Sequence, residues 1–191
     1  MALDLIGKAL VRPLPEGLVR GRIVETEAYA GQQDPASHAY RKVTQRNQVM
    51  FGPAGYLYVY VSYGMHVCMN VVTDEDGIAG AVLIRAVEPL EGLSVMQERR
   101  GGRPVHELCN GPGKLCQAFG ITLEQYGADL EGPALWLEDD GYQVHEVRRT
   151  SRVGISAGEQ LPLRFLLPGN SYVSPGKPSA SLPDDVIPIL S

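Results

Sequence analysis

Hydrophobic and polar positions alternate in several short segments of the chain, which is the pattern of strands in a β-sheet. Leu18–Ala30 is rich in β-branched residues at a spacing of two, and it predicts a strand. Tyr56–Tyr63 and Met65–Thr73 repeat this pattern on either side of Gly64. Because glycine readily takes the positive φ of a tight turn, the two segments predict a β-hairpin. Ala81–Val87 is almost entirely apolar, as expected of a central strand.

Two helices are predicted after these strands. Leu90–Arg100 ends in arginines, which suit the negative end of a helix dipole. Gly111–Phe119 has Pro112 in its first turn and Gly120 just after its end, a combination typical of helix termini. Leu3–Val11 predicts a short helix, or a helix that runs into a strand. Further strands are predicted near Leu135–Glu138, Tyr142–Arg148 and Leu161–Leu167.

Together these elements predict an α+β fold. We expect a single domain over residues 1–174, with an antiparallel β-sheet core, surrounding short helices and a protruding β-hairpin. Residues 175–191 are rich in Pro and Ser and predict a loose C-terminal tail. Gly31–Gly55 is predicted to be mostly loop, and a loop of this length in a small domain is often functional.

The composition is that of a globular protein, with 44% hydrophobic and 20% charged residues. No apolar run approaches the roughly 20 residues of a membrane span, and no signal pattern opens the chain. We therefore expect an intracellular protein without a membrane partner, in the cytoplasm or nucleoid if the source is prokaryotic. The 3 cysteines lack CxxC spacing and the 4 histidines are dispersed, so no metal site is expected.

The net charge of −5 argues against nucleic-acid binding, but the distribution of charge matters more than its sum. Acidic residues crowd Glu124–Asp140. Basic residues recur in three clusters: Arg41, Lys42 and Arg46; Arg99, Arg100 and Arg103; and Arg148, Arg149 and Arg152. These clusters fit either one basic face on an acidic body or ordinary solvated surface. Lys114 follows a Gly-Pro-Gly segment at a helix start, where backbone N–H groups and a lysine favour a phosphate.

Two carboxylates stand on one face of the strand IVETEAY. Glu25 and Glu27 are two residues apart, so they project from the same side and lie about 7 Å apart along the strand. A solvated strand face would explain both residues. Alternatively, one of them is a general base that activates water near an electrophilic carbon. The strand pattern alone does not choose between the two glutamates.

Arg85 interrupts the apolar strand that follows the hairpin. A buried guanidinium needs a partner, which is a carboxylate, a tyrosine hydroxyl or a phosphate. A structural ion pair would satisfy it as well as a functional contact. Glu88 is near in sequence but lies on the opposite face of the strand.

The hairpin is rich in tyrosine. Tyr56, Tyr58 and Tyr60 share one strand face, which suits core packing or a pocket that stacks flat rings. Tyr63 adjoins the glycine turn, where a large ring is poorly placed for the core but could enter a stack of bases as a wedge. Asn70 lies in an apolar strand, so its amide must bond to backbone or to the edge of a ligand.

Taken in order, these segments resemble the alkyladenine (3-methyladenine) DNA glycosylase family. The resemblance covers about residues 4–174, and ETEAY, YVY…YGM…N and NGPGKLCQA are specific in combination. The matching stretches are DLIGKALV, GRIVETEAYAG, DPASHAY, RNQVMFGPAGYLYVYVSYGMHVCMNVV, AVLIRAVEPLEGL, LCNGPGKLCQAFGI and RFLLPGNSYVS.

The resemblance implies a role for each candidate residue. Glu27, the second glutamate of ETEAY, would position and activate the attacking water, and Arg85 would hold the water or a phosphate beside it. Tyr29 and His38 would line the base pocket, His38 partly through its backbone amide. Tyr60 would stack on the flipped base from the other side.

The resemblance also implies a role for Asn70 in the base pocket and roles for other residues in contacts to the DNA outside it. Tyr63 would be the wedge that fills the vacated stack, and Asn70 would guard the purine edge at which guanine carries its amino group. Arg46, Arg100 and Lys114 would contact the DNA backbone.

The family resemblance also implies the reaction and the partner. We expect a monofunctional, monomeric base-excision-repair glycosylase without metal or other cofactor, acting on duplex DNA that contains alkylated or deaminated purines. Two positions depart from the family pattern: His66, where an aromatic is expected in some members, and Leu163, where many carry Trp. Neither position belongs to the proposed chemistry. The alternatives are a non-catalytic nucleic-acid-binding module and a hydrolase of free nucleosides.

Overall fold

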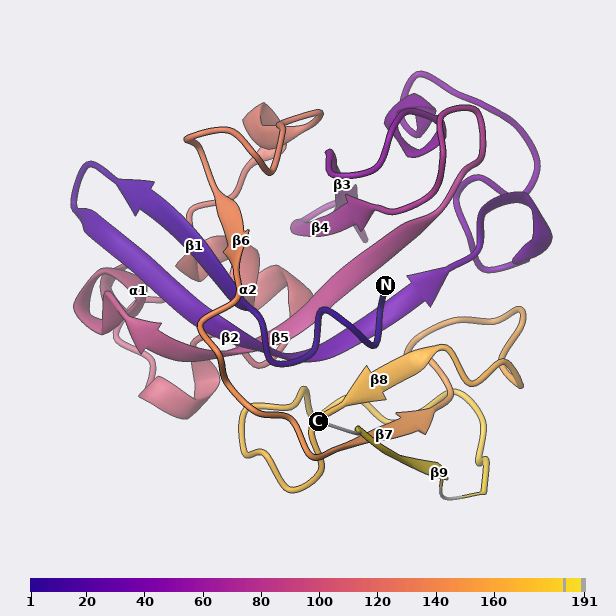
Figure 1. The fold of residues 1–191 in the computed structure, drawn as a ribbon. Helices are drawn as coiled ribbons and strands as arrows, with labels where there is room; N and C mark the ends of the chain where they lie inside the picture. Colours follow the sequence, from indigo (N-terminus) through magenta and orange to yellow (C-terminus); the bar gives the residue numbers. More distant parts are fainter. Residues whose placement is uncertain (184, 190–191) are drawn as a thin grey trace.

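The computed structural model of the protein describes residues 1–183 and 185–189. Within these residues, one antiparallel sheet contains nine strands, in the order β3-β4-β5-β2-β8-β7-β9, with β1 and β6 beside it (Figure 1). The strands are β1 (Ala9–Leu14), β2 (Gly17–Tyr29), β3 (Leu57–Ser62), β4 (His66–Val72), β5 (Ala81–Glu91), β6 (Trp136–Glu138), β7 (Glu146–Thr150), β8 (Arg164–Leu166) and β9 (Asp185–Pro188). The sheet and its few short helices confirm the predicted α+β class.

Strand β2 changes its partner halfway along one edge. Its first half pairs with β1, whereas Glu25–Glu27 pairs with β8. Along its other edge, β2 pairs with β5 from Arg20 to Tyr29, and the register of this pairing shifts around Glu25. In Figure 1, β1 and β6 accordingly lie beside one end of the long β2–β5 pair, and β7, β8 and β9 lie beside the other. Residues 21–27 of β2 are therefore all buried.

Two short helices complete the core. Helix α1 (Leu93–Arg99) packs on α2 and β2, and helix α2 (Pro112–Ala118) packs on β4 and β5. Their buried side chains Met96 and Leu115 join the apolar residues of the sheet in one cluster. Helix α2 begins with a proline and is followed by Gly120 at a φ of 63°, as the sequence predicts.

The β3–β4 hairpin ends in the predicted tight turn. Tyr63 and Gly64 have φ values of 49° and 72°, and the Met65 N–H donates to the Ser62 carbonyl. Positive φ at both central residues is the mark of the turn that matches the twist of a hairpin. The left-handed backbone turns Tyr63 away from the sheet, and 82% of its surface is exposed.

The structure corrects several predicted boundaries. Residues 90–91 continue β5, because Glu91 pairs with Arg20, a partner that local sequence does not reveal. At Gly92, φ is 76° and a Cβ would lie 2.4 Å from the Leu18 carbonyl oxygen, so the strand ends there and α1 starts at Leu93. Residues 2–7 form turns rather than a helix, and β7 begins only at Glu146.

The C-terminal segment is more ordered than the sequence predicts. Within the predicted loose tail, β9 pairs with β7 over four residues, from Asp185 to Pro188. Pro178 also bridges to Val153, so this segment lies along the sheet edge. The domain boundary at residue 174 stays a prediction. No helix in the described part of the chain has the length and apolar character that a membrane crossing requires.

Candidate active site

A cavity of about 690 Å³ opens between the β3–β4 hairpin and two loops. One wall is formed by the hairpin from Tyr58 to Gly64, together with Pro112 at the start of α2. The cavity is also lined by Pro35, Ala36 and His38 of the long loop and by residues 153–157, which follow β7. Pockets that hold a drug-sized or base-sized ligand have volumes of about 300–1,000 Å³. The cavity is therefore large enough for a single flat heterocycle.

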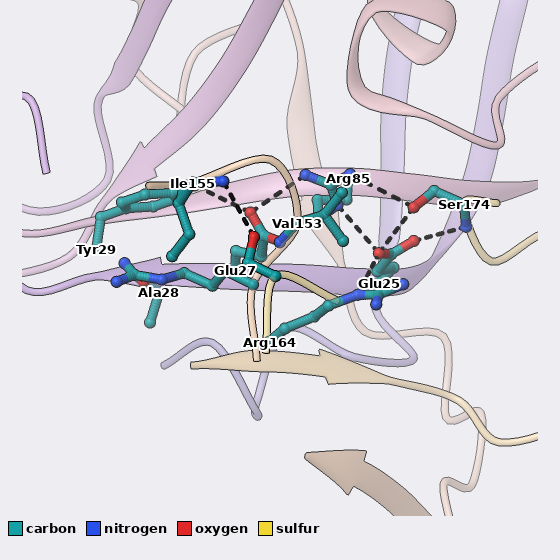
Figure 2. Close-up of polar contacts among 11 residues, drawn as sticks. Glu25, Glu27, Ala28, Tyr29, Arg85, Val153, Ile155, Arg164 and Ser174 are labelled. Atoms are coloured by element: carbon teal, nitrogen blue, oxygen red, sulfur yellow. Dashed lines mark hydrogen bonds and ion pairs between the residues drawn. The ribbon is translucent and has the colours of Figure 1, made fainter. Parts of the chain in front are cut away.

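Both strand glutamates lie in the protein interior beside this cavity. Glu25 and Glu27 are each 0% exposed, which excludes the solvated strand face. Arg85 joins them, with Nε 3.0 Å from Glu25 Oε1 and Nη1 3.2 Å from Glu27 Oε2 (Figure 2). Burial opposes the charge on Arg85, but the Glu27 and Glu25 carboxylates outweigh it and raise the pKa of the guanidinium. Arg85 therefore forms a buried ion pair, and its partners are Glu25 and Glu27 rather than Glu88.

Glu25 is occupied by structural partners. Besides Arg85, Arg164 Nε donates to its Oε1 at 2.7 Å. Ser174 donates twice, from its backbone N–H to Oε2 at 2.6 Å and from its hydroxyl to Oε1 at 2.9 Å. Three of these four donors share Oε1 and one reaches Oε2, and neither Arg164 nor Ser174 lines the cavity. Glu25 therefore neutralises two buried arginines, and most of its donors are groups outside the cavity wall.

Glu27 has a different set of neighbours, each of which reaches the cavity. Its Oε2 accepts from the Tyr29 hydroxyl at 3.0 Å and from Arg85, and its Oε1 accepts from the Val153 N–H at 2.7 Å. Tyr29, Arg85 and Val153 all line the cavity, and the buried Glu27 is hydrogen-bonded to all three (Figure 2). A carboxylate has about four acceptor positions, so three donors leave one of them, on Oε1. The arrangement distinguishes the two glutamates that the sequence pattern leaves equivalent.

Aromatic rings of the hairpin and the long loop also line the cavity. The Tyr58 and Tyr60 rings stack with centroids 5.2 Å apart, and the edge of His38 meets Tyr60 at 4.6 Å. Nδ1 of His38 lies 2.7 Å from the Tyr58 hydroxyl, a hydrogen bond that fixes the ring. Tyr58 is 1% exposed and packs in the core, and it also contributes to the cavity lining; Tyr60 is half-buried and lines the cavity. Core packing and a ring-lined pocket therefore both apply to this tyrosine face.

Asn70 and the hairpin tip complete the cavity. Asn70 is 3% exposed, donates to the Tyr58 carbonyl at 3.1 Å and still contributes to the cavity lining. Tyr63 projects at the rim on the turn of the hairpin. The structure thus brings Tyr29, His38, Tyr60, Tyr63, Asn70 and Arg85 together around one cavity, with Glu27 bonded to two of them.

The predicted backbone-contact residues lie at different distances from this centre. Arg46 lines the cavity, donates to the Val61 carbonyl at 3.0 Å and lies 5.2 Å from the centre of the Tyr60 ring. Lys114 bonds to Asn110 at 2.7 Å in the first turn of α2. Arg100 bonds to Gln117. Lys114 and Arg100 are not part of the cavity wall, and their contact with DNA stays a prediction.

Some site residues carry no local signal in the sequence. Val153 contributes only its backbone N–H, which no residue pattern reveals. Arg164 and Ser174 reach Glu25 from 139 and 149 positions along the chain. Arg152 is the largest correction, because the sequence groups it with surface arginines whereas the structure buries it completely. It pairs with Asp34, also buried, from 118 positions away.

Comparison with known proteins identifies the family. The model of the methylpurine-DNA glycosylase (MPG) family matches residues 1–171 of the chain. The chain belongs to this family. It is 51% identical over 176 residues to a protein of Carboxydothermus hydrogenoformans, covering 91% of this chain and 92% of the relative. It is 49% identical over 176 residues to a protein of Chlorobaculum parvum, covering 91% and 84%. Both relatives are provisionally named 3-methyladenine DNA glycosylases.

A third relative covers the chain equally well. The protein of Alkaliphilus oremlandii, with the same provisional name, is 46% identical over 183 residues, or 90% of this chain and 91% of its own length. As a member of the methylpurine-DNA glycosylase family, the protein is a DNA repair glycosylase that acts on DNA. The cavity and the Glu27 group are the features of this family member that could carry the reaction. In the described part of the chain, no cluster of His, Cys, Asp and Glu could hold a metal ion.

Proposed function

We propose that the protein hydrolyses the N-glycosidic bond of alkylated purines in duplex DNA, with Glu27 as the base that activates water. One observation carries the proposal: Glu27 is a buried carboxylate whose three donors all line a base-sized cavity. The family and the provisional names of the relatives support the substrate class.

The chemistry follows from the acceptor position left on Glu27. A water held there passes a proton to the carboxylate as its oxygen bonds to the sugar carbon C1′. The bond between C1′ and the purine nitrogen breaks, and its electron pair leaves with the base. Positive charge develops on the sugar in such reactions, and the buried carboxylate stabilises that charge. The nucleophile is water, so the product is an intact strand with an abasic site.

Arg85 and Tyr29 keep Glu27 in place during this step. A guanidinium has five N–H donors, of which Arg85 uses one on Glu25 and one on Glu27 and directs one toward Ser174. Arg85 itself lines the cavity, so a donor that it leaves free is proposed to hold the water beside Glu27. Because Arg85 is charged and bridges both carboxylates, it holds the Glu27 side chain in a fixed position beside the cavity.

The target nucleotide must leave the duplex, at a cost of a few kcal/mol, before it can enter the cavity. Tyr63 is proposed to offset this cost by entering the vacated stack, because its ring is exposed at the tip of a rigid turn beside the cavity. Arg46, Arg100 and Lys114 are proposed to bind backbone phosphates around this point. Arg46 is the best placed, since it already lies at the cavity rim.

The cavity wall supports the proposed preference for alkylated purines. A purine methylated at N3 or N7 carries positive charge, and the faces of Tyr29 and Tyr60 attract such a cation by about 1–2 kcal/mol. Asn70 is held by its bond to the Tyr58 carbonyl, so it cannot move aside for the amino group of guanine. Favourable stacking together with this obstruction selects damaged bases over normal guanine.

Substitution of Glu27 by Gln tests the proposal. Glutamine keeps the size of the side chain but accepts a proton poorly, so base release in single-turnover assays should fall by at least about 100-fold. Binding to lesion-containing DNA should stay near that of the wild type. The matched control is Glu131→Gln, at an exposed glutamate outside the cavity wall, which should release base normally. Near-wild-type release by Glu27→Gln would refute the role of Glu27.

A further inference from the structure

A second buried ion pair lies beside the cavity, between Arg152 and Asp34. Their side chains are 0% and 1% exposed. Arg152 Nη1 donates to Asp34 Oδ2, and Nη2 donates to Oδ1 at 2.8 Å, so the pair is bidentate. The ion pair joins the long loop after β2 to the segment after β7, and residues of both segments line the cavity.

Asp34 fixes the first of these segments. Its carboxylate also accepts from the N–H groups of Ala30, at 3.2 Å, and Ala36, at 3.0 Å. Burial disfavours the charged form of Asp34, but the hydrogen bonds from Arg152 and Ala36 outweigh it and keep the pKa of Asp34 below its usual value. The residues that follow, up to His38, line the cavity. The position of this wall therefore depends on the Asp34 carboxylate.

Arg152 fixes the second segment and the end of β2. Its Nη1 also donates to the Ala28 carbonyl at 3.0 Å, and its guanidinium lies 4.7 Å from the centre of the Tyr29 ring. The next residue in the chain is Val153, whose N–H donates to Glu27. A shift of Arg152 would therefore move both the Tyr29 ring and one of the three donors to the carboxylate.

Stability alone is a poor reason for such a pair. Taking two charges out of water is costly, and replacing a buried pair by apolar residues is often neutral or stabilising. We propose that Arg152 and Asp34 are positioning residues for base release, which hold the Val153 N–H against Glu27 and the Tyr29 ring at the cavity wall. The inference rests on the proposed function, because it acts through Glu27.

The test is the substitution Arg152→Lys. Lysine keeps the charge but replaces the planar fork by a single point donor, so it cannot bind Asp34 and Ala28 in the same geometry. Single-turnover base release should fall roughly 10- to 100-fold, because misplacement of a reacting group by 1 Å has an effect of that size. Affinity for lesion-containing DNA should stay near that of the wild type. The control is Arg149→Lys, the same change in the half-exposed pair with Asp185, which should leave release unchanged.

A double-mutant cycle separates positioning from a merely structural role. If Arg152 acts through Glu27, the Arg152→Lys variant releases base more slowly than the wild type. The double variant should then release base at the same residual rate as Glu27→Gln alone. An equal fractional loss in both backgrounds would overturn the proposal, as would normal release by Arg152→Lys. Asp34→Asn provides a second route, since it keeps one acceptor oxygen and the side-chain shape, and the same dependence on Glu27 is expected.

The cycle also shows which proposal has failed. Normal release by Glu27→Gln would refute the proposed function, and the positioning role with it. Slow release by Glu27→Gln together with normal release by Arg152→Lys would overturn the positioning role alone.

Discussion

The Tyr29 hydroxyl donates to the Glu27 carboxylate at 3.0 Å, from two positions further along the same strand. Burial and the charge of Glu27 raise the pKa of Tyr29 well above its usual value, so the hydroxyl stays protonated and remains a donor. The ring of Tyr29 also forms part of the cavity wall. One residue therefore contacts both the proposed base and the space in which the substrate would lie.

Replacing Tyr29 by Phe separates these two contacts. The ring stays, but Glu27 loses a hydrogen bond of the charge-assisted kind, which contributes about 1.5–3 kcal/mol. Single-turnover base release should fall by roughly 10-fold or more, with little change in affinity for lesion-containing DNA. Tyr142→Phe, at a residue outside the cavity, is the control. Equal losses in affinity and in rate would show that the hydroxyl acts on binding instead.

Substitution of Glu25 should affect stability more than that of Glu27. Glu25→Gln leaves Arg85 and Arg164 buried without their shared counter-charge. Removing one partner of a buried ion pair costs about 3–5 kcal/mol, so urea denaturation should show a loss of this size in the free energy of unfolding. A loss below about 1 kcal/mol would mean that the two arginines find other partners.

Tyr63→Ala tests the wedge. Because Tyr63 is 82% exposed, its removal should leave the thermal melting temperature unchanged. It should reduce the fluorescence increase of 2-aminopurine placed next to a lesion, which reports unstacking of the flipped site. Leu123→Ala, which removes an exposed apolar side chain elsewhere, should have no effect. Equal fluorescence in Tyr63→Ala and wild type would exclude the wedge.

Lys114→Ala tests the predicted phosphate contact. Loss of one such contact should weaken binding about equally for all sequences and reduce the slope of log affinity against log salt by about 1. The substitution Lys177→Ala, at an exposed lysine in residues 175–191, provides the comparison. An unchanged salt slope for Lys114→Ala would remove this residue from the DNA interface.

The three buried cysteines should react slowly with alkylating reagents in the folded protein. Burial raises the pKa of Cys68, which lines the cavity, to about 11, and that of Cys109 to about 12. Burial also raises the pKa of Cys116 well above its usual value. The thiols should therefore be alkylated slowly by iodoacetamide at pH 8 in the native protein, and rapidly once urea unfolds it. Mass spectrometry of the trapped protein measures this difference.

The raised pKa of Cys68 also makes the stability of the folded protein depend on pH. A raised pKa means that the neutral thiol is favoured in the folded state, so this stability is present below the ordinary value of 9.0 for Cys68 and is lost as pH rises toward about 11. Fast alkylation of native Cys68 at pH 8 would contradict the prediction.

Local sequence predicts the hairpin and the central strands because their signals are local. The apolar run around Ile84 and the glycine turn at Gly64 determine structure within a few residues. The end of β5 is different, because Glu91 becomes strand only through its pairing with Arg20 of β2. The strand β9 likewise depends on pairing with β7, although its own residues predict a loose segment.

The same contrast holds for the candidate site. The strand pattern identifies Glu25 and Glu27 as a pair but gives each the same face, so only their buried neighbours distinguish them. The resemblance to the family selects Glu27 through the motif ETEAY. Arg152 was missed because a charged residue in a basic cluster is usually exposed, and its partner Asp34 is remote in sequence.

The partners of the two glutamates have a consequence for the order of folding during synthesis. Both carboxylates leave the ribosome early, on β2, whereas the donors Val153, Arg164 and Ser174 are translated late. Until then Glu25 lacks three of its four donors, so burying it in the sheet of a nascent chain is unfavourable. A chain that ends just before residue 174 would therefore lose stability at β2 although it keeps the residues that line the cavity.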